Sequence, residues 1–427
     1  MYGHGGGGRL VVGLASIALL AGCAAAATPV PQTPSSPTTS TPEATATMST
    51  PAAGTAPTAA LPAAAAQTAA GAGPGVWRPV ADMGTARSLH TASLLPDGRV
   101  LIAGGLGFDG EDPSVLASTE LFDPTTGTWT PGPPMIEPRQ LHTAVSLSDG
   151  TVLVFGGGGA QGEPLATVEA YDPATGSWTA RARMPGPEPV SGGWSPPVVT
   201  RLADDRVLVS GGMGGSDYLA RAAVYDPAAD RWEEVAPMGT PRADHTATLL
   251  PDGTVLAVGG LTADPASTSP GMEVQLASAE LFDPMRGQWV AVAAMREPRS
   301  GHTATLLPAG RVLVAGGGPS ASAEVYEPTT RSWRQLRPMT AAREGHVAVA
   351  LADGRILMIG GTGDWMGGRS TSVEVFDPLT ETWTPAGSLS TPRTSFTATP
   401  LEDGRVLVAG SGLLGVGASK AAEVYGP

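Results

Sequence analysis

Histidine recurs at similar intervals along this chain of 427 residues, and histidine is the commonest metal-ligating side chain. Each recurring histidine begins a similar apolar segment; they are His90, His142, His245, His302 and His346. Two further segments carry Trp194 and Phe396 at this position, and neither side chain can ligate a metal. A position that accepts all three residue types is typical of packing. We therefore expect these histidines to be structural, with no metal and no cofactor bound.

An arginine and a glutamate recur together in the same segments. The arginine stands three residues before the histidine position, and the glutamate stands two residues before a later aromatic residue. The third segment lacks both and carries Ser191 and Ala223. Their joint loss predicts that they form partly buried ion pairs, since an unpaired buried charge is costly. The expected pairs join Arg87, Arg139, Arg242, Arg299, Arg343 and Arg393 to Glu120, Glu169, Glu280, Glu324, Glu374 and Glu423.

These positions belong to a unit of roughly fifty residues that occurs seven times. In one copy, a β-branched and leucine-rich strand over 245–250 ends at the turn Pro251-Asp-Gly253. A second strand over 254–258 ends at Gly259-Gly260, a third covers 279–282, and Trp289 marks the fourth. Four short antiparallel strands in each repeat predict an all-β, seven-bladed β-propeller.

The repeat resembles the kelch repeat, whose signature is a Gly-Gly pair followed by an aromatic residue and a tryptophan at set spacings. The segment Asp252-Gly-Thr-Val-Leu-Ala-Val-Gly-Gly260 is similar to the kelch propellers of galactose-oxidase-like proteins, and the resemblance covers about residues 76–427. Copper-radical oxidases of that group need a cysteine crosslinked to a tyrosine. Residues 76–427 contain no cysteine, so the resemblance implies the fold without the copper chemistry.

The ends of the repeat region predict how the ring closes. Six repeats have a fourth-strand tryptophan, but the last repeat stops at Tyr425-Gly-Pro427 without one. Trp77 and Met83 stand before the first repeat at the spacing of a fourth strand. We expect residues 77–83 to supply the outer strand of the last blade.

The first 75 residues have a different character. Residues 1–23 are typical of an export signal, and Leu20-Ala-Gly-Cys23 resembles the lipobox of bacterial lipoproteins, in which Cys23 would become the acylated N-terminus. Residues 24–75 are rich in Ala, Thr, Pro and Ser, with Glu43 as their only charge, so we expect a disordered tether. These features predict an exported protein, lipid-anchored on the outer face of a bacterial membrane, at the cell surface or in the periplasm.

Net charge and loop variability bear on the partner. The 25 Lys and Arg residues stand against 39 Asp and Glu, a net charge of -14 that disfavours nucleic acid. Connections from second to third strands and from fourth to first strands share one face, and they vary between repeats. Variable loops on a rigid scaffold usually carry binding. The candidate ligand-binding residues are Asp109, Glu111, Asp112, Glu163, Trp194, Asp217, Tyr218, Arg221, Glu273, Asp364, Trp365 and Arg369.

This composition of carboxylates with aromatic residues leaves the partner open between a protein and a carbohydrate. We expect a non-catalytic, monomeric binding module that contacts a membrane only through its anchor. The alternative is a kelch-type sugar epimerase or mutarotase, which would need only acid and base side chains at the mouth of the propeller. Calcium at Asp109, Glu111 and Asp112 is a weaker possibility, because clustered carboxylates are usually just solvated.

Overall fold

The computed structural model describes residues 75–108, 113–186, 195–215, 217–266, 272–318, 320–363, 368–413 and 417–427. The regular structure in these residues is antiparallel β-sheet, apart from one turn of 3-10 helix, η1 (Pro308–Gly310). Within the described ranges, no helix has the length and apolar character needed to span a membrane. The all-β class predicted from the sequence is confirmed.

The described residues form seven sheets of four strands, which we call blades 1 to 7 in chain order. From inner to outer strand, blade 1 contains β3 (Thr91–Leu94), β4 (Val100–Ala103), β7 (Thr119–Asp123) and β8 (Thr128–Gly132). Blades 2 to 4 repeat this order with β9 (Thr143–Ser146), β10 (Val152–Phe155), β11 (Val168–Asp172) and β12 (Ser177–Arg181); β13 (Val198–Arg201), β14 (Val207–Ser210), β17 (Ala222–Asp226) and β18 (Arg231–Glu234); and β19 (Thr246–Leu249), β20 (Val255–Val258), β23 (Ala279–Asp283) and β24 (Gln288–Val292). Blades 5 to 7 contain β25 (Thr303–Leu306), β26 (Val312–Ala315), β27 (Ala323–Glu327) and β28 (Ser332–Gln335); β29 (Val347–Ala350), β30 (Ile356–Ile359), β31 (Ser372–Asp377) and β32 (Thr382–Ser388); and β33 (Thr397–Pro400), β34 (Val406–Ala409), β37 (Ala422–Gly426) and β1 (Val76–Pro79).

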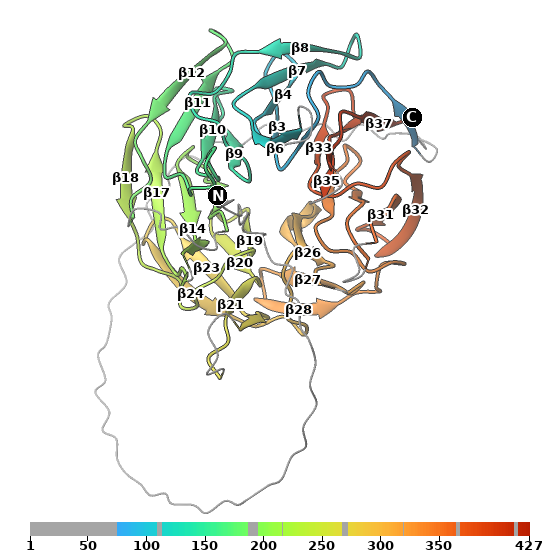
Figure 1. Cartoon of the computed structure of the whole chain (residues 1–427). Helices are drawn as coiled ribbons and strands as arrows, with labels where there is room; N and C mark the ends of the chain where they lie inside the picture. The colour runs from blue at the N-terminus through green and yellow to red at the C-terminus, as the bar shows by residue number, and fades with distance from the viewer. Residues whose placement is uncertain are drawn as a thin grey trace, which may run out of the picture. The chain divides into compact units, whose positions relative to one another are not determined.

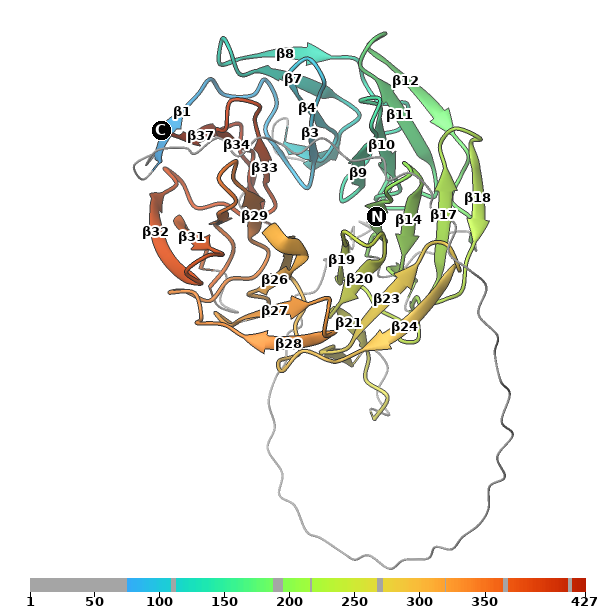
Figure 2. The same ribbon diagram turned by 180° about the vertical axis from the view of Figure 1, so that it is seen from behind.

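The blades are arranged in a closed ring (Figure 1, Figure 2). The first strand of each blade contacts that of the next blade, and β33 returns to β3. Blade 7 takes its outer strand from the other end of the chain, because β1 pairs with β37 and places Trp77 opposite Tyr425. The indole Nε1 of Trp77 donates a hydrogen bond of 3.2 Å to the carbonyl of Ala386 in blade 6. The ring is therefore closed by hydrogen bonds and packing.

Removing residues 1–83 should destabilise the whole ring, since β1 and the buried Met83 would both be lost. We expect a loss of roughly 5 kcal/mol in the free energy of unfolding, from the burial of Trp77 and Met83. Thermal and denaturant unfolding would measure it. A matched truncation that removes only residues 1–74 should unfold like the full chain. Equal stability of the two truncated proteins would contradict this closure.

The core lies between the blades. The second strand of every blade is buried along its whole length, and apart from Ser210 in blade 3 these strands are continuous apolar runs such as Val100-Leu-Ile-Ala103. On the third strand of blade 1, the Phe122 ring packs 4.9 Å from the Trp129 ring, measured between centroids. The Trp129 Nε1 donates a 2.7 Å hydrogen bond to the carbonyl of Ala81.

The recurring histidines also lie between blades. The Nε2 of His302 is 2.9 Å from the Thr246 hydroxyl of the preceding blade. Burial, together with the positive charge of Arg299, lowers the pKa of His302 to about 3. In blade 7 the equivalent residue is Phe396, which belongs to an apolar cluster with Val347 of blade 6, the residue at the position of Thr246. The position therefore serves packing between blades.

All six predicted arginine–glutamate pairs are in contact, each within one blade. In blade 5, the Arg299 guanidinium lies 3.0 Å from the Glu324 carboxylate and also donates to the carbonyls of Gly316 and Ser322. Glu324 in turn accepts a hydrogen bond of 2.8 Å from the backbone N–H of Arg296. The pair thus ties the segment before the first strand to the second and third strands. The other pairs are Arg87–Glu120, Arg139–Glu169, Arg242–Glu280, Arg343–Glu374 and Arg393–Glu423.

The third repeat corrects the sequence alignment. Its first strand, β13, begins at Val198, which pairs with Ser210 as Thr91 pairs with Ala103 in blade 1. The histidine position of this blade is therefore Pro197, and the assignment of Trp194 to it was wrong. Counting back three residues from Pro197 places the arginine position at 194 and not at 191. The aromatic ring of Trp194 suggested the wrong register, because the strand pairing that fixes it is not visible in the sequence.

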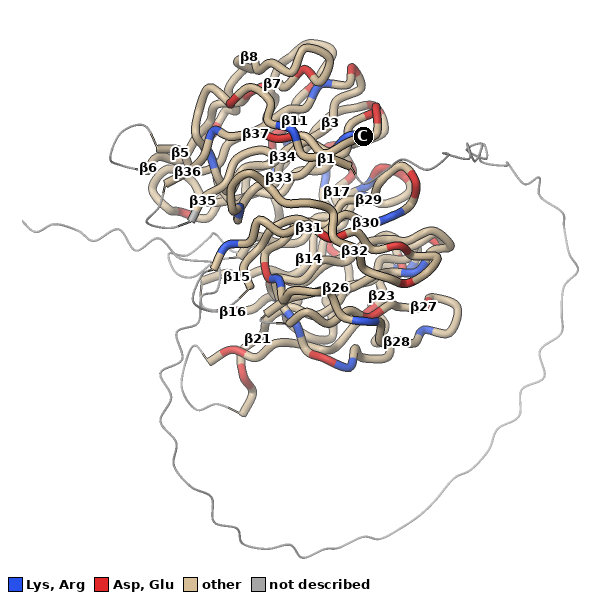
Figure 3. Tube along the Cα trace, turned by 90° about the vertical axis from the view of Figure 1, so that its right-hand side faces the viewer, with Lys and Arg blue, Asp and Glu red and all other residues tan. Residues whose placement is uncertain are grey.

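Small sheets project from the connections between second and third strands, and in blade 1 a strand that precedes β3 adds a third strand to this sheet. They comprise β2 (Arg87–Ser88), β5 (Leu106–Phe108) and β6 (Pro113–Val115); β15 (Met213–Gly214) and β16 (Asp217–Tyr218); β21 (Leu261–Ala263) and β22 (Glu273–Gln275); and β35 (Gly412–Leu413) and β36 (Gly417–Ala418). Figure 3 shows β5, β6, β15, β16, β21, β35 and β36 on the same side of the ring. We call this side the hairpin face. The opposite side, with the Pro-Asp-Gly and Asp-Pro turns, is the turn face.

Candidate functional site

Several candidate residues lie outside the described part of the chain, so the structure does not place them. They are Cys23, Asp109, Glu111, Asp112, Trp194, Asp364 and Trp365. Glu163 is described and supports its own turn, because its carboxylate accepts a 2.7 Å hydrogen bond from the backbone N–H of Gln161. Arg369 forms a backbone bridge with Thr362 in blade 6. The structure therefore does not bring Glu163 and Arg369 into one site with the remaining candidates.

Tyr218 and Glu273 come from different blades and meet on the hairpin face. The Tyr218 hydroxyl donates a hydrogen bond to the Glu273 carboxylate, which joins β16 of blade 3 to β22 of blade 4. Burial and this hydrogen bond to Glu273 raise the pKa of Tyr218. Tyr218 is therefore a neutral hydrogen-bond donor that links two hairpins.

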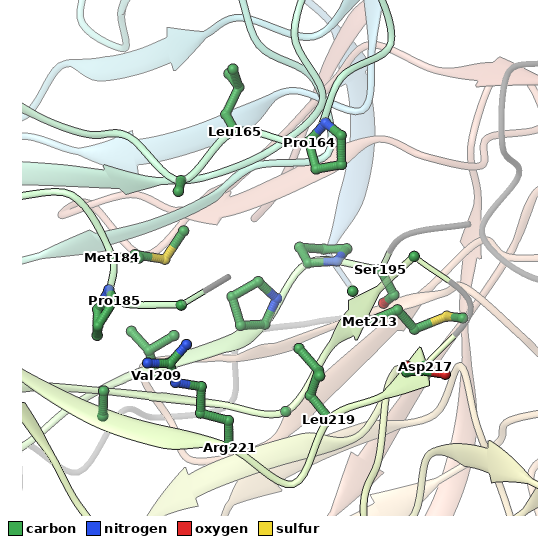
Figure 4. A pocket seen from close by; sticks show the side chains of 18 of the residues that line it. Pro164, Leu165, Met184, Pro185, Ser195, Val209, Met213, Asp217, Leu219 and Arg221 are labelled. Atoms are coloured by element: carbon green, nitrogen blue, oxygen red, sulfur yellow. The ribbon is translucent and has the colours of Figure 1, made fainter. Parts of the chain in front are cut away.

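Asp217 and Arg221 line a pocket on the hairpin face, between blades 2 and 3, that we call the blade-3 pocket (Figure 4). Its volume is about 390 Å³. The walls are mainly apolar and come from the connections of both blades and from the strands of blade 3; they include Pro164, Leu165, Met184, Pro185, Pro197, Val209, Met213, Leu219, Ala223 and Trp232. The arrangement can receive an apolar group, with charged side chains at its rim.

The pocket lies where the other six blades carry the arginine–glutamate pair. Ala223 stands at the glutamate position of blade 3, on the strand β17. The methyl group of Ala223 cannot replace the glutamate side chain, and the neighbouring apolar residues are left more exposed. Val209 has 8% of its surface exposed, whereas its counterpart in blade 1, Ile102, has 0%. Met184 is only partly buried, although its counterpart Met135 is 3% exposed.

The arginine of this blade is in a different place. Arg221 directly precedes the third strand, β17, at a position where five other blades have a serine or a threonine. Its guanidinium forms a salt bridge with Glu234 on the outer strand of the same blade. Arg221 therefore does not occupy the position between the strands that Arg299 fills in blade 5.

Asp217 lines the pocket and Asp244 contacts the lining residue Ser195, and we call this side the acidic rim. The hydroxyl of Ser195, a lining residue, donates a 2.7 Å hydrogen bond to the Asp244 carboxylate. Burial, together with the negative charge of Asp244, raises the pKa of Glu344. Asp217 is exposed at the same side of the pocket. A cationic group would thus be stabilised here beside the apolar walls.

Sequence reasoning missed most of the pocket. It selected Asp217 and Arg221 for their charge, but not the apolar residues Met184, Val209 and Leu219 that form the walls. The joint absence of arginine and glutamate from the third repeat was the available signal.

The described residues show no arrangement of three or more His, Cys, Asp or Glu side chains suited to a metal ion. Each recurring histidine has its Nε2 directed at a hydroxyl group, as His142 has at Thr91, 2.8 Å away, and His245 at Ser210, 3.2 Å away. These imidazoles lie inside the blade boundaries, where their burial and hydroxyl partners leave them a packing role.

Comparison with known proteins gives the same architecture. One solved structure, a fungal alcohol oxidase of the AA5 family in complex with copper, superimposes with a TM-score of 0.64 and 18% sequence identity. The match covers 83% of this chain and 77% of the oxidase. At this identity the likeness concerns the fold.

Sequence comparisons identify the repeats. The chain is 29% identical over 226 residues to Kelch-like protein 35 of Mus musculus, a match that covers 53% of this chain and 35% of that protein. It is 33% identical over 81 residues to alpha-scruin of Limulus polyphemus, covering 19% of this chain and 8% of that protein. The chain thus spans about a third or less of these relatives. A model of the KLHDC2/KLHL20/DRC7 Kelch-repeats domain matches residues 89–318, and a Kelch motif matches residues 345–390. This protein belongs to the kelch-repeat family.

Proposed function

We propose that this protein is an exported, lipid-anchored kelch module that binds a protein partner through its hairpin face, without catalysis. The observation that carries the proposal is the blade-3 pocket, where the buried ion pair of the other six blades is replaced by an apolar hollow on the variable face. An exposed pocket with apolar walls on a rigid scaffold is typical of a binding site.

The chemistry of the pocket favours a protein over a carbohydrate. A sugar is held by several hydrogen-bonding side chains, whereas the walls here are formed by Leu165, Met184, Val209, Met213 and Leu219. Protein interfaces are enriched in methionine and aromatic residues at their centres, with charged residues at the rim. The blade-3 pocket has this distribution, with Asp217 and Arg221 at the rim.

The location rests on the N-terminal sequence. An acylated Cys23 would hold the body on the membrane, and residues 24–75 would separate the two. The variant Cys23→Ser lacks the acylation site and tests this anchor. When it is expressed in cells, it should be released from the membrane fraction.

Site-specific photo-crosslinking on whole cells tests the proposal. Ala263 on β21 and Met285 in the turn after β23 are both exposed and lie on opposite faces of blade 4. A photoreactive residue at position 263 should give a discrete protein adduct, and the captured protein, once purified, should bind the purified full chain. The same residue at position 285 should give none. Equal adducts at both positions, or an adduct at 285 alone, would refute binding through the hairpin face.

A further inference from the structure

We infer that the blade-3 pocket receives one long aliphatic or aromatic side chain of a partner peptide, and that a lysine or arginine next to it in the peptide faces the acidic rim. The inference rests on the proposed function and specifies the partner of the same site.

The dimensions and walls of the pocket define the anchoring side chain. A volume of about 390 Å³ is near the lower end of the range for ligand pockets, so the pocket suits one large side chain and its backbone. Its lining is mainly apolar and includes Val209, Ala223 and Trp232 of blade 3. Large side chains buried in pockets of this kind dominate the affinity of protein interfaces.

Charge defines the neighbouring residue. Asp217 is at the rim, and Asp244 is held beside the lining residue Ser195. Glu273 lies next to Tyr218, whose pKa Glu273 and Asp244 both help to raise. The cationic Arg221 is already paired with Glu234. A lysine or arginine of the partner would therefore lie near the carboxylates of Asp217, Asp244 and Glu273, consistent with the charge of -14 on the chain.

The walls are held in place by hydrogen bonds. In the β15–β16 hairpin, Met213 pairs with Tyr218 and Gly214 with Asp217. The backbone N–H of Leu219 donates a 3.0 Å hydrogen bond to the carbonyl of Gly212. A preformed pocket lowers the ordering cost of binding, and this favours recognition of a short peptide segment.

Gly214 offers a way to fill the pocket. It lines the pocket, and a Cβ added to it would meet only Leu219 methyl groups, at 3.7 Å, which is ordinary contact. Gly363 is its counterpart in blade 6, where the Arg343–Glu374 pair is present, and a Cβ there would lie 3.6 Å from the carbonyl of Ala342. Gly214→Phe and Gly363→Phe are thus matched variants.

The test screens the purified full chain against an immobilised hexapeptide library. The two central residues vary: one is Ala, Leu, Met, Phe or Trp, and its neighbour is Lys, Glu or Ser. We expect selection of a large apolar residue next to Lys. The selected peptide should bind Gly214→Phe at least tenfold more weakly, and it should bind Gly363→Phe as tightly as the original chain. Thermal unfolding would establish that both variants fold.

Asp217→Lys tests the charge. It should weaken the peptides with Lys at least fivefold and favour those with Glu. Absence of any selected peptide, unchanged binding by Gly214→Phe, or unchanged preference in Asp217→Lys would overturn the inference.

The variant Trp194→Ala tests whether a residue of the chain itself, and not a partner peptide, occupies the blade-3 pocket. If Trp194→Ala lowers the thermal midpoint by several degrees and only this variant binds the peptides, the pocket is filled by the chain itself and the inference is wrong. An unchanged midpoint with unchanged binding supports it. A crosslinked partner at position 263 that binds Gly214→Phe normally would refute this inference and leave the proposed function intact. Absence of any adduct at position 263 in the otherwise unchanged chain would refute the proposed function.

Discussion

Acidification from pH 7 to pH 5 is expected to lower the free energy of unfolding of the ring by on the order of 10 kcal/mol. Burial, together with the charge of the neighbouring arginine, lowers the pKa of His90, His142, His302 and His346 to about 3. The same causes lower the pKa of His245. In the unfolded chain these imidazoles have a pKa of about 6.5.

The direction of the effect follows from which state binds protons. Between pH 6.5 and pH 3 the unfolded chain takes up protons at these histidines and the folded ring does not, so stability falls as the pH falls. Each histidine contributes roughly 2 kcal/mol between pH 7 and pH 5. Carboxylates with a lowered pKa, such as Asp205, which accepts a hydrogen bond from Ser148, act below about pH 4. The interval from pH 7 to pH 5 therefore reports mainly on the histidines, while Glu344, whose pKa is raised by burial, contributes in the opposite direction.

Denaturant unfolding at several pH values would measure the dependence, and the chain supplies its own control. Blade 7 has Phe396 packed against Val347 in place of a histidine and a threonine. The variant Thr246→Val with His302→Phe copies this pair at the boundary between blades 4 and 5, where the two native side chains are 2.9 Å apart. It should fold, and its stability should fall less steeply with pH, by about 1.4 kcal/mol per pH unit. An unchanged slope would show that His302 is not buried as a neutral group.

The fold could be predicted from the sequence because the residues that form each contact recur in successive repeats. Arg299 and Glu324 recur together in six repeats and are jointly missing from the third, so their pairing followed without coordinates. The outer position of Trp77 followed in the same way, because the last repeat lacks a tryptophan to pair with Tyr425. Comparison of the repeats that contain a residue with the repeat that lacks it thus indicated which residues are in contact.

The binding face could be predicted only in part, because its residues are not repeated. The contact between Tyr218 and Glu273 joins loops of two blades, and no spacing in the sequence encodes it. In the third repeat, the register is set by the pairing of Val198 with Ser210 in the hairpin of β13 and β14. Without that register, neither the position of Trp194 in the repeat nor the pocket beside Ala223 could be derived.

The second large effect is expected at a buried ion pair. Arg299 and Glu324 are 1% and 2% exposed, and each makes further hydrogen bonds to the backbone. Arg299→Ala leaves the Glu324 carboxylate buried without its partner, which should cost about 3–5 kcal/mol in the free energy of unfolding. Glu324→Ala should cost a similar amount, because it leaves a buried guanidinium.

The double variant Arg299→Ala with Glu324→Ala should be more stable than Arg299→Ala, since it contains no unpaired buried charge. Blade 3 is the natural precedent, because its Ala223 occupies the glutamate position. Arg206→Ala is the matched control: the Arg206–Asp204 salt bridge of 2.9 Å is exposed, so its loss should cost less than about 1 kcal/mol. Denaturant unfolding of the four variants would give the coupling energy between Arg299 and Glu324. Additive losses would show that the two residues act independently through their backbone hydrogen bonds, and the pair would then not explain why both are missing from the third repeat.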